Sequence, residues 1–180
     1  VIGTAGADTI TGNGENNILD GKAGADEITG GAGNDTLKGG EEYTINISGP
    51  VTNGTTYSFK IGETTISVND ATSLNNLLTK LRDSTNTSTL GTATIDTVNN
   101  TLKITSSDYV VSTPTTNVTI TEESVVDTVK YDDATSAVTV DLGSSAQQNV
   151  GGGRGLDTIS GFEKVVGSEY ADTFYVNENE

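Results

Sequence analysis

The chain has 180 residues, with nine basic and 25 acidic side chains, and its formal net charge of −16 disfavours binding to nucleic acid or anionic lipid. The absence of cysteine and histidine excludes disulfides, thiolate metal sites and imidazole catalysis. Its 22 glycines and lack of tryptophan leave little material for a conventional core, so another source of stability is expected.

The amino terminus lacks the charged and apolar regions of a signal peptide, and no apolar run approaches the length of a membrane span. We therefore expect no membrane insertion. The sequence starts at Val1 without methionine, which leads us to expect a piece of a longer protein. A cysteine-free composition rich in Thr, Asn, Gly and Asp is typical of exported bacterial surface proteins.

A nine-residue repeat runs four times without gaps over residues 3–38, as GTAGADTIT, GNGENNILD, GKAGADEIT and GGAGNDTLK. Position one is always Gly, position six is Asp or Asn, and position eight is Ile or Leu. Because glycine permits positive-φ turns, the first six residues predict a turn, and the last three predict a short strand with position eight inward. Two repeats then complete one coil, with strands in two facing sheets. A flexible linker would not need aliphatic residues in register.

Coils of 18 residues place position-six side chains above one another, Asp8 over Asp26 and Asn17 over Asp35. Two carboxylates about 5 Å apart repel by roughly 3 kcal/mol at an effective dielectric near 20, so a bare stack opposes folding. A divalent cation reverses the sign of this energy. Carboxylates combined with turn carbonyls suit Ca²⁺ better than Mg²⁺, because Ca²⁺ accepts six to eight oxygens in flexible geometry.

These repeats resemble the RTX nonapeptide family, whose motif G-G-x-G-x-D-x-U-x forms a calcium-loaded parallel β-roll. GGAGNDTLK matches every defined column of the motif. GNGENNILD departs from it, with Glu15 in place of the glycine at position four and Asn17 in place of the aspartate at position six. A neutral amide binds a cation more weakly than a carboxylate, which weakens the case for metal on the edge of Asn17 and Asp35.

Residues 41–123 change in composition and predict an inserted α+β domain. Leucines at i, i+3, i+4 and i+7 (Leu74, Leu77, Leu78 and Leu81) behind Thr72 or Ser73 predict one amphipathic helix. The order of strand, strand, helix and hairpin resembles small modules inserted in bacterial flagellin and hook proteins, which implies a spacer or display domain. Alternating apolar residues predict strands at 43–48, 56–61, 64–68, 92–98, 101–107 and 117–121, with a hairpin turn at 98–101.

Residues 124–180 return to the repeat pattern and are expected to continue the β-roll or β-helix. Asp127-Thr128-Val129 has the order of Asp8-Thr9-Ile10, which predicts that the insert lies in the turn of a fifth nonamer begun by Gly39 and Gly40. GGRGLDTIS (152–160) and GSEYADTFY (167–175) are read as further nonamers. Before them we expect a strand within 135–143 and a loop at 144–152, and between them a strand within 161–166 on the opposite sheet.

The predicted architecture is thus mainly β: a parallel β-roll (1–40), a small α+β domain (41–123) and a continued β-roll or β-helix (124–180). The resemblance implies calcium ligands at position six and at turn glycines of the repeats. The implied set is Asp8, Asn17, Asp26, Asp35, Asp127, Asp157 and Asp172 with Gly3, Gly6, Gly21, Gly24, Gly30, Gly33, Gly152 and Gly155.

These features predict a calcium-binding structural module of a secreted or cell-surface bacterial protein, of the surface-layer, adhesin or matrix type. By resemblance, it would stay open during type I secretion and fold in calcium outside the cell. The open ends of the roll would stack on neighbouring repeats of a longer chain or on other copies.

Two alternatives are open. RTX rolls also follow exported enzymes and toxins, and this segment would then be their non-catalytic part. We expect no catalysis here, because GxSxG and HExxH motifs are absent and the adjacent acids Glu122-Glu123 and Asp132-Asp133 are expected to be solvated. The inserted domain could instead bind a glycan or a protein partner through aromatic side chains, namely Tyr43, Tyr57, Phe59 or Tyr109.

Overall fold

A computed structural model describes residues 1–88, 90–106, 110–112, 114–123 and 125–176. The chain forms two compact units, one of Val1–Gly40 with Val125–Glu180 and one of Glu41–Ser124, here called the roll unit and the insert unit. Both units are built mainly of β-strands, and the described residues contain a single helix, in the insert unit. The predicted fold class, mainly β with a parallel roll and one helix, is confirmed.

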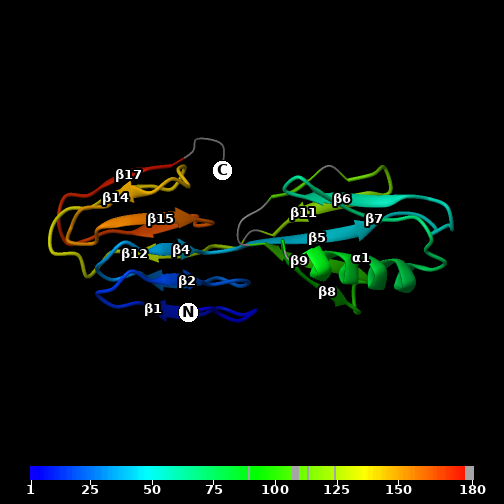
Figure 1. Ribbon diagram of the computed structural model, residues 1–180, viewed down its shortest axis with the longest axis horizontal. Coiled ribbons are helices and arrows are strands. Elements are labelled where there is room, and N and C mark those ends of the chain that lie inside the picture. Colours follow the sequence, from blue (N-terminus) through cyan, green and yellow to red (C-terminus); the bar gives the residue numbers. More distant parts are fainter. Residues whose placement is uncertain (89, 107–109, 113, 124, 177–180) are drawn as a thin grey trace. The chain divides into compact units, whose positions relative to one another are not determined.

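Short strands in the roll unit stack layer by layer (Figure 1). The first sheet has the order β1 (Thr9–Thr11), β3 (Glu27–Thr29), β12 (Thr128–Lys130), β16 (Lys164–Val166), and all its pairings are parallel. The second has the order β2 (Ile18–Asp20), β4 (Thr36–Lys38), β15 (Leu156–Ser160), β14 (Gln148–Asn149), and only β14 is antiparallel. A separate parallel pair joins β13 (Thr139–Asp141) to β17 (Thr173–Tyr175). The layers run from β1 and β2 at the amino-terminal end to β14 and β17 at the other, and β14 lies beyond β15 although it precedes it in the chain.

Position eight fills the interior of the roll in six repeats, but Phe174, position eight of GSEYADTFY, is 42% exposed. One buried column runs through the first sheet and another through the second: Ile10, Ile28 and Val129, then Leu19, Leu37 and Ile159. A slip of one residue would turn each aliphatic side chain to the solvent face. The nine-residue period therefore sets the register of both sheets.

The insertion point lies inside a repeat. The chain leaves the roll after Gly40, and β12, the first strand after the insert, pairs with β3 so that Thr128 stands opposite Glu27. The Gly39 N–H donates to the Ser160 carbonyl (3.0 Å) and the Thr128 N–H to the Asp26 carbonyl (2.8 Å). A Cβ on Gly39 would be 2.7 Å from Asp127 Oδ2, so Gly39 lies against Asp127 as Gly21 lies against Asp26 within one repeat.

The segment before β15 departs from the regular coil. We expected a loop at 144–152, but residues Gln148–Asn149 form β14, with Gln148 opposite Asp157 in antiparallel pairing. The reversal is possible because Gly151, Gly152 and Gly153 all have positive φ (80°, 59° and 79°), a region that glycine adopts without steric cost.

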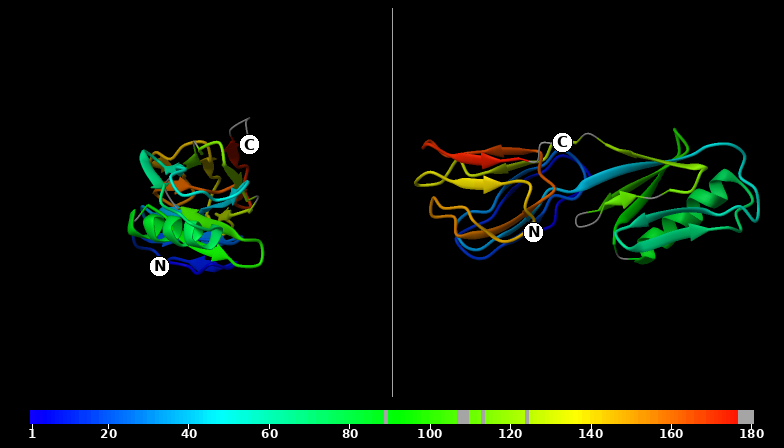
Figure 2. Two further views of the ribbon diagram at one scale, coloured as in Figure 1. Left: turned by 90° about the vertical axis from the view of Figure 1, so that its right-hand side faces the viewer. Right: turned by 90° about the horizontal axis from the view of Figure 1, so that it is seen from above.

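The insert unit has two antiparallel sheets. The larger has the order β11 (Val118–Glu122), β5 (Glu41–Ile47), β9 (Thr101–Ser106), β8 (Thr92–Asp96), and the smaller has the order β10 (Val111–Ser112), β6 (Tyr57–Ile61), β7 (Thr64–Val68). Helix α1 (Leu74–Ser88) packs against β7, β8 and β9 and lies along strands of its own unit in Figure 2. Within the described ranges, no helix is long and apolar enough to cross a membrane.

The cap of helix α1 is Ser73, one of the two residues expected there: the Asn76 N–H donates to its Oγ (3.2 Å), and the Thr72 N–H donates to Asn76 Oδ1 (3.2 Å). Three of the predicted leucines, Leu77, Leu78 and Leu81, are fully buried. Of the aromatic residues considered as ligand platforms, Tyr43, Tyr57 and Phe59 are buried in the core and so do not serve that role. Tyr109 lies outside the described residues.

Candidate functional site

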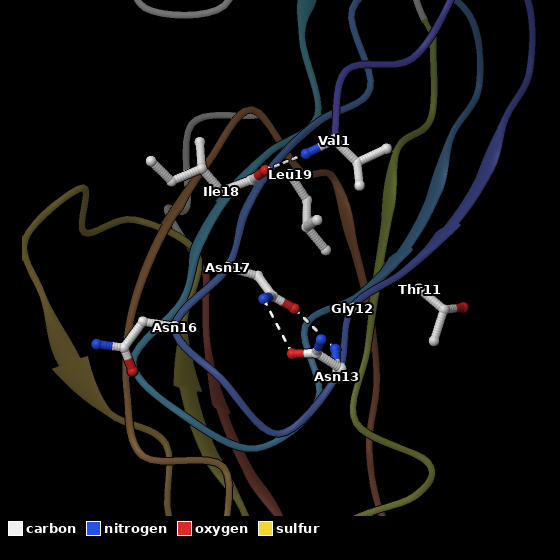
Figure 3. Close-up of a pocket in the computed structure, with 8 residues that line it drawn as sticks. All are labelled: Val1, Thr11, Gly12, Asn13, Asn16, Asn17, Ile18 and Leu19. Carbon is white, nitrogen blue, oxygen red and sulfur yellow. Dashed lines mark hydrogen bonds between the residues drawn. The ribbon is translucent and has the colours of Figure 1, made fainter.

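Each of three repeats closes its turn with the position-six side chain, which bonds back to position two of the same repeat. Asp8 Oδ2 accepts bonds from the Thr4 N–H (2.6 Å) and hydroxyl (3.0 Å). Asn17 Oδ1 accepts the Asn13 N–H (2.7 Å), as drawn in Figure 3. Asp172 likewise accepts the Ser168 hydroxyl at Oδ1 (2.6 Å). In these repeats, the turn between positions two and six is thus closed by a hydrogen bond to a carboxylate or amide side chain.

A row of hydrogen bonds joins successive turns along one edge of the roll. The Asp8 N–H donates to Asp26 Oδ1 (2.8 Å), and the Asp26 N–H donates to Asp127 Oδ1 (2.7 Å). The Asp127 N–H donates in turn to Glu163 Oε2 (2.7 Å). This row, the first ladder, contains the stack of Asp8 on Asp26 that an 18-residue coil requires.

The second ladder runs along the repeats that enter the other sheet. The Asn17 N–H donates to Asp35 Oδ1 (2.8 Å), and the Asp35 N–H donates to Asp157 Oδ1 (3.0 Å). Asp172 is in neither row, since its Oδ1 accepts the Val138 N–H (2.8 Å) beside the β13–β17 pair. The structure therefore brings six of the seven predicted position-six residues into two ladders and leaves Asp172 apart.

Four carboxylates in these ladders are almost fully buried: Asp26, Asp35, Asp127 and Asp157 are at most 1% exposed. Burying a charged carboxylate is costly unless positive charge or hydrogen bonds compensate it. Burial raises the pKa of Asp35, against the opposing effects of the Asn17 N–H and the Arg154 charge. Asp35 Oδ2 is buried and accepts no hydrogen bond from the described residues. This oxygen suits a cation.

Glycine at position one allows the carboxylate to lie directly against the main chain. A Cβ on Gly30 would be 2.4 Å from Asp35 Oδ2, so no other residue fits without displacing the carboxylate. Gly3 and Gly21 lie against Asp8 and Asp26 in the same manner. Gly152 does not, because a Cβ there would meet Ala134 and Ser136.

Position four forms a second stack of backbone. Gly33 has φ of 118°, and its Cβ position is 2.7 Å from the Glu15 carbonyl oxygen, so both conformation and space require glycine. Gly155 lies on Gly33 in the next coil, and Gly24 lies on Gly6 on the other edge. Among the described residues, three acidic side chains nowhere gather as a metal cluster. A cation at these turns would therefore take most of its oxygens from backbone carbonyls.

Three residues of the ladders were missed in the sequence. Glu163 takes the position-six place above Asp127, and its position directly before the apolar strand β16 could have indicated this. The Tyr131 hydroxyl donates to Asp157 Oδ2 (3.0 Å), and burial followed by the charge of Asp157 raises the pKa of Tyr131. Arg154 is 8% exposed and donates to Asp133 Oδ2 (3.0 Å) and to the Asp133 carbonyl (2.7 Å). Nothing in the repeat pattern pointed to Tyr131 or Arg154.

A hollow of about 450 Å³ lies beside the first coil and is shown in Figure 3. Three amide side chains line part of it, those of Asn13, Asn16 and Asn17, and the Val1 ammonium donates to the Ile18 carbonyl (2.6 Å) at its rim. With neutral amides in place of carboxylates, this turn has a weaker attraction for cations than the Asp35 turn.

Comparison with protein families gives a match over the repeats. The family model of the RTX calcium-binding nonapeptide repeat (4 copies) matches residues 1–26. No curated protein is similar enough to the chain to be counted as a relative. RTX nonapeptide repeats bind Ca²⁺ and are generally structural and non-catalytic. Over residues 1–26, the glycine turns and position-six side chains therefore match the RTX calcium-binding nonapeptide repeat.

Proposed function

We propose that this chain is a structural module of a secreted or cell-surface bacterial protein and that it becomes rigid when calcium binds outside the cell. The observation that carries the proposal is the buried Asp35, which has one carboxylate oxygen without a hydrogen-bond partner among the described residues. Asp8, Asp26 and Asp35 would provide carboxylate oxygens. The turns containing Gly3, Gly6, Gly21, Gly24, Gly30 and Gly33 would provide carbonyl oxygens.

The ladders make folding conditional. Asp26 and Asp127 are buried in adjacent coils, joined by a hydrogen bond of 2.7 Å, so their charges oppose closure of the roll. A bound calcium ion supplies the compensating positive charge. A site with a dissociation constant of about 0.1 mM in about 1 mM calcium adds about 1.4 kcal/mol, so about four sites would contribute as much as the stability of a small domain.

A surface-layer, adhesin or matrix role follows from this conditional rigidity. RTX proteins are typically exported by type I secretion, and an open chain in calcium-poor cytosol suits such export. The open end of the roll exposes Ile2 and Ile18, each more than 65% accessible, and the edge strand β1. We infer that this end stacks on neighbouring repeats or on another copy, and that the insert unit is a spacer or display domain without catalytic function.

The experiment that tests the proposal is a calcium titration of the full chain, followed by chelator, monitored by circular dichroism. We expect β signal to increase with calcium and to fall with chelator. Asp35→Asn keeps the acceptor for the Asn17 N–H but removes the charge, and should weaken the calcium response. Asp83→Asn makes the same charge change at an exposed position of helix α1 and should leave the calcium response unchanged. A wild-type spectrum indifferent to calcium would refute the proposed function.

A further inference from the structure

Asp35 and Asp157, the two aspartates of the second ladder, have different surroundings although both are at position six of their repeats. Both oxygens of Asp157 accept hydrogen bonds from the protein: Oδ1 from the Asp35 N–H (3.0 Å) and Oδ2 from the Tyr131 hydroxyl (3.0 Å). Asp35 uses only Oδ1, and its Oδ2 has no donor among the described residues. One carboxylate is thus satisfied by the chain itself and the other is not.

Packing in the core of the roll holds Tyr131 beside Asp157. Its side chain is 1% exposed and belongs to the apolar cluster of the roll, directly after β12. A buried tyrosine needs a partner for its hydroxyl, and the phenol is a good donor to a carboxylate. The ring thus packs as a core residue while the hydroxyl reaches the end of the second ladder.

Arg154 brings a positive charge to the same place. It lies three residues before Asp157, is 8% exposed, and is anchored by two hydrogen bonds to Asp133. Its charge acts on both Asp35 and Asp157 and favours their ionised forms. The turn before β15 therefore contains a buried positive charge, whereas Lys22, in a turn of the second coil, is 37% exposed and pairs with Asp20.

Most of the apolar core of the roll also comes from the residues that follow the insert. Of the buried cluster, residues 1–40 contribute four side chains, which are Ile10, Leu19, Ile28 and Leu37. Residues 125–180 contribute eight, which are Val129, Tyr131, Ala134, Val138, Val140, Val150, Ile159 and Phe162. More apolar area removed from water gives these later coils more stability that does not depend on metal.

We propose that Tyr131 and Arg154 form a built-in clamp on Asp157 that replaces a calcium ion at this turn. Strands β12 and β15 then stay folded without calcium and are the template on which the first two coils close. Asp157, an expected calcium ligand by its motif, is assigned to the clamp. Only the closing of the first two coils rests on the proposed function; the calcium-free stability of β12 and β15 does not.

The clamp is tested by hydrogen exchange of the full chain in chelator. Amides of β12 and β15 should be protected, whereas those of β1 and β2 should exchange at least about tenfold faster. Tyr131→Phe should speed exchange in β15 about tenfold or more, because it removes a hydrogen bond to a buried carboxylate. Tyr170→Phe, at a side chain that is 55% exposed, is the control and should change nothing. Equal exchange of β2 and β15 in chelator would overturn the proposal.

A second measurement separates the clamp from general packing. If Tyr131 acts through Asp157, Tyr131→Phe should have little further effect on exchange in an Asp157→Asn background, whereas additive effects would contradict the clamp. In equilibrium dialysis, Asp157→Asn should bind as many calcium ions as the wild type, and Asp35→Asn should bind fewer. Loss of an ion by Asp157→Asn would also overturn the assignment. A wild type that binds no calcium would refute the proposed function, while the chelator experiment would still test the clamp.

Discussion

The first two coils of the roll and the insert unit are both built of short strands, but they are stabilised differently. The insert unit buries sixteen hydrophobic side chains in one cluster, among them Tyr57, Phe59 and Leu78. The first 40 residues contribute four to the cluster of the roll and bury Asp26 and Asp35 beside them. A region with a large apolar core folds unaided, whereas a region whose interior carries negative charge depends on the solution to supply cations.

The largest effect expected from this difference is a selective loss of structure in chelator. Residues 1–40 should lose protection because the buried carboxylates then lack the positive charge of calcium, and the strands of the insert unit should keep theirs. Residue-resolved NMR or hydrogen exchange of the full chain measures both regions in one sample. If both regions lost protection together, the comparison between them would be wrong.

Truncation of a core side chain in the insert unit should destabilise that unit and leave the roll unit unaffected. Leu78→Ala removes a fully buried side chain and should destabilise the insert unit by about 2–5 kcal/mol, while the calcium midpoint of the roll stays unchanged. Asn75→Ala, at an exposed position of the same helix, is the control. Thermal unfolding with and without calcium measures the effect. A shifted calcium midpoint in Leu78→Ala would show that the two units are coupled.

A methyl group at the turn should weaken the roll alone. Gly30→Ala places a Cβ 2.4 Å from Asp35 Oδ2 and should cost about 1–3 kcal/mol in the calcium-loaded roll through forced displacement of the carboxylate. Gly14→Ala is the matched control, because no atom lies within 4 Å of its Cβ position. Calcium titrations followed by circular dichroism compare the two variants. Equal midpoints would mean that this carboxylate does not bind the ion.

The smallest effect concerns pH in the absence of calcium. Burial raises the pKa of Asp157 to about 6, although the Asp35 N–H and the Tyr131 hydroxyl oppose the shift. The folded state therefore holds a proton between about pH 4 and 6 that the unfolded state releases. This stabilisation is fully present below about pH 4 and is lost as the pH rises through 6.

Melting curves of the roll in chelator should accordingly show a higher Tm at pH 5 than at pH 7.5. Asp157→Asn cannot titrate and should remove most of that difference, whereas Asp83→Asn, on the exposed helix of the insert unit, should retain it. A Tm that rises between pH 5 and pH 7.5 would contradict the direction of the shift.

Much of the molecule was predictable from local pattern. The nine-residue period determined which aliphatic side chains enter the roll, because Ile10 and Leu19 recur in register in the next coil. The leucine spacing placed helix α1, and Ser73 was one of two expected caps. The stack of Asp8 on Asp26 also followed from two repeats per coil. Each of these features depends on residues close in sequence or on strict repetition, which leaves few alternatives.

Only the tertiary structure decided the end of each ladder. Tyr131 reaches Asp157 across 26 residues and Arg154 reaches Asp133 across 21, and no repeat relates these pairs. Glu163 in place of a position-six aspartate and the antiparallel strand β14 likewise depend on how the chain packs after the insert. The sequence by itself determined the period, the interior columns and the calcium chemistry of the opening coils. Where the repetition ends, contacts between distant residues decide which donors meet which carboxylates, and local pattern does not encode them.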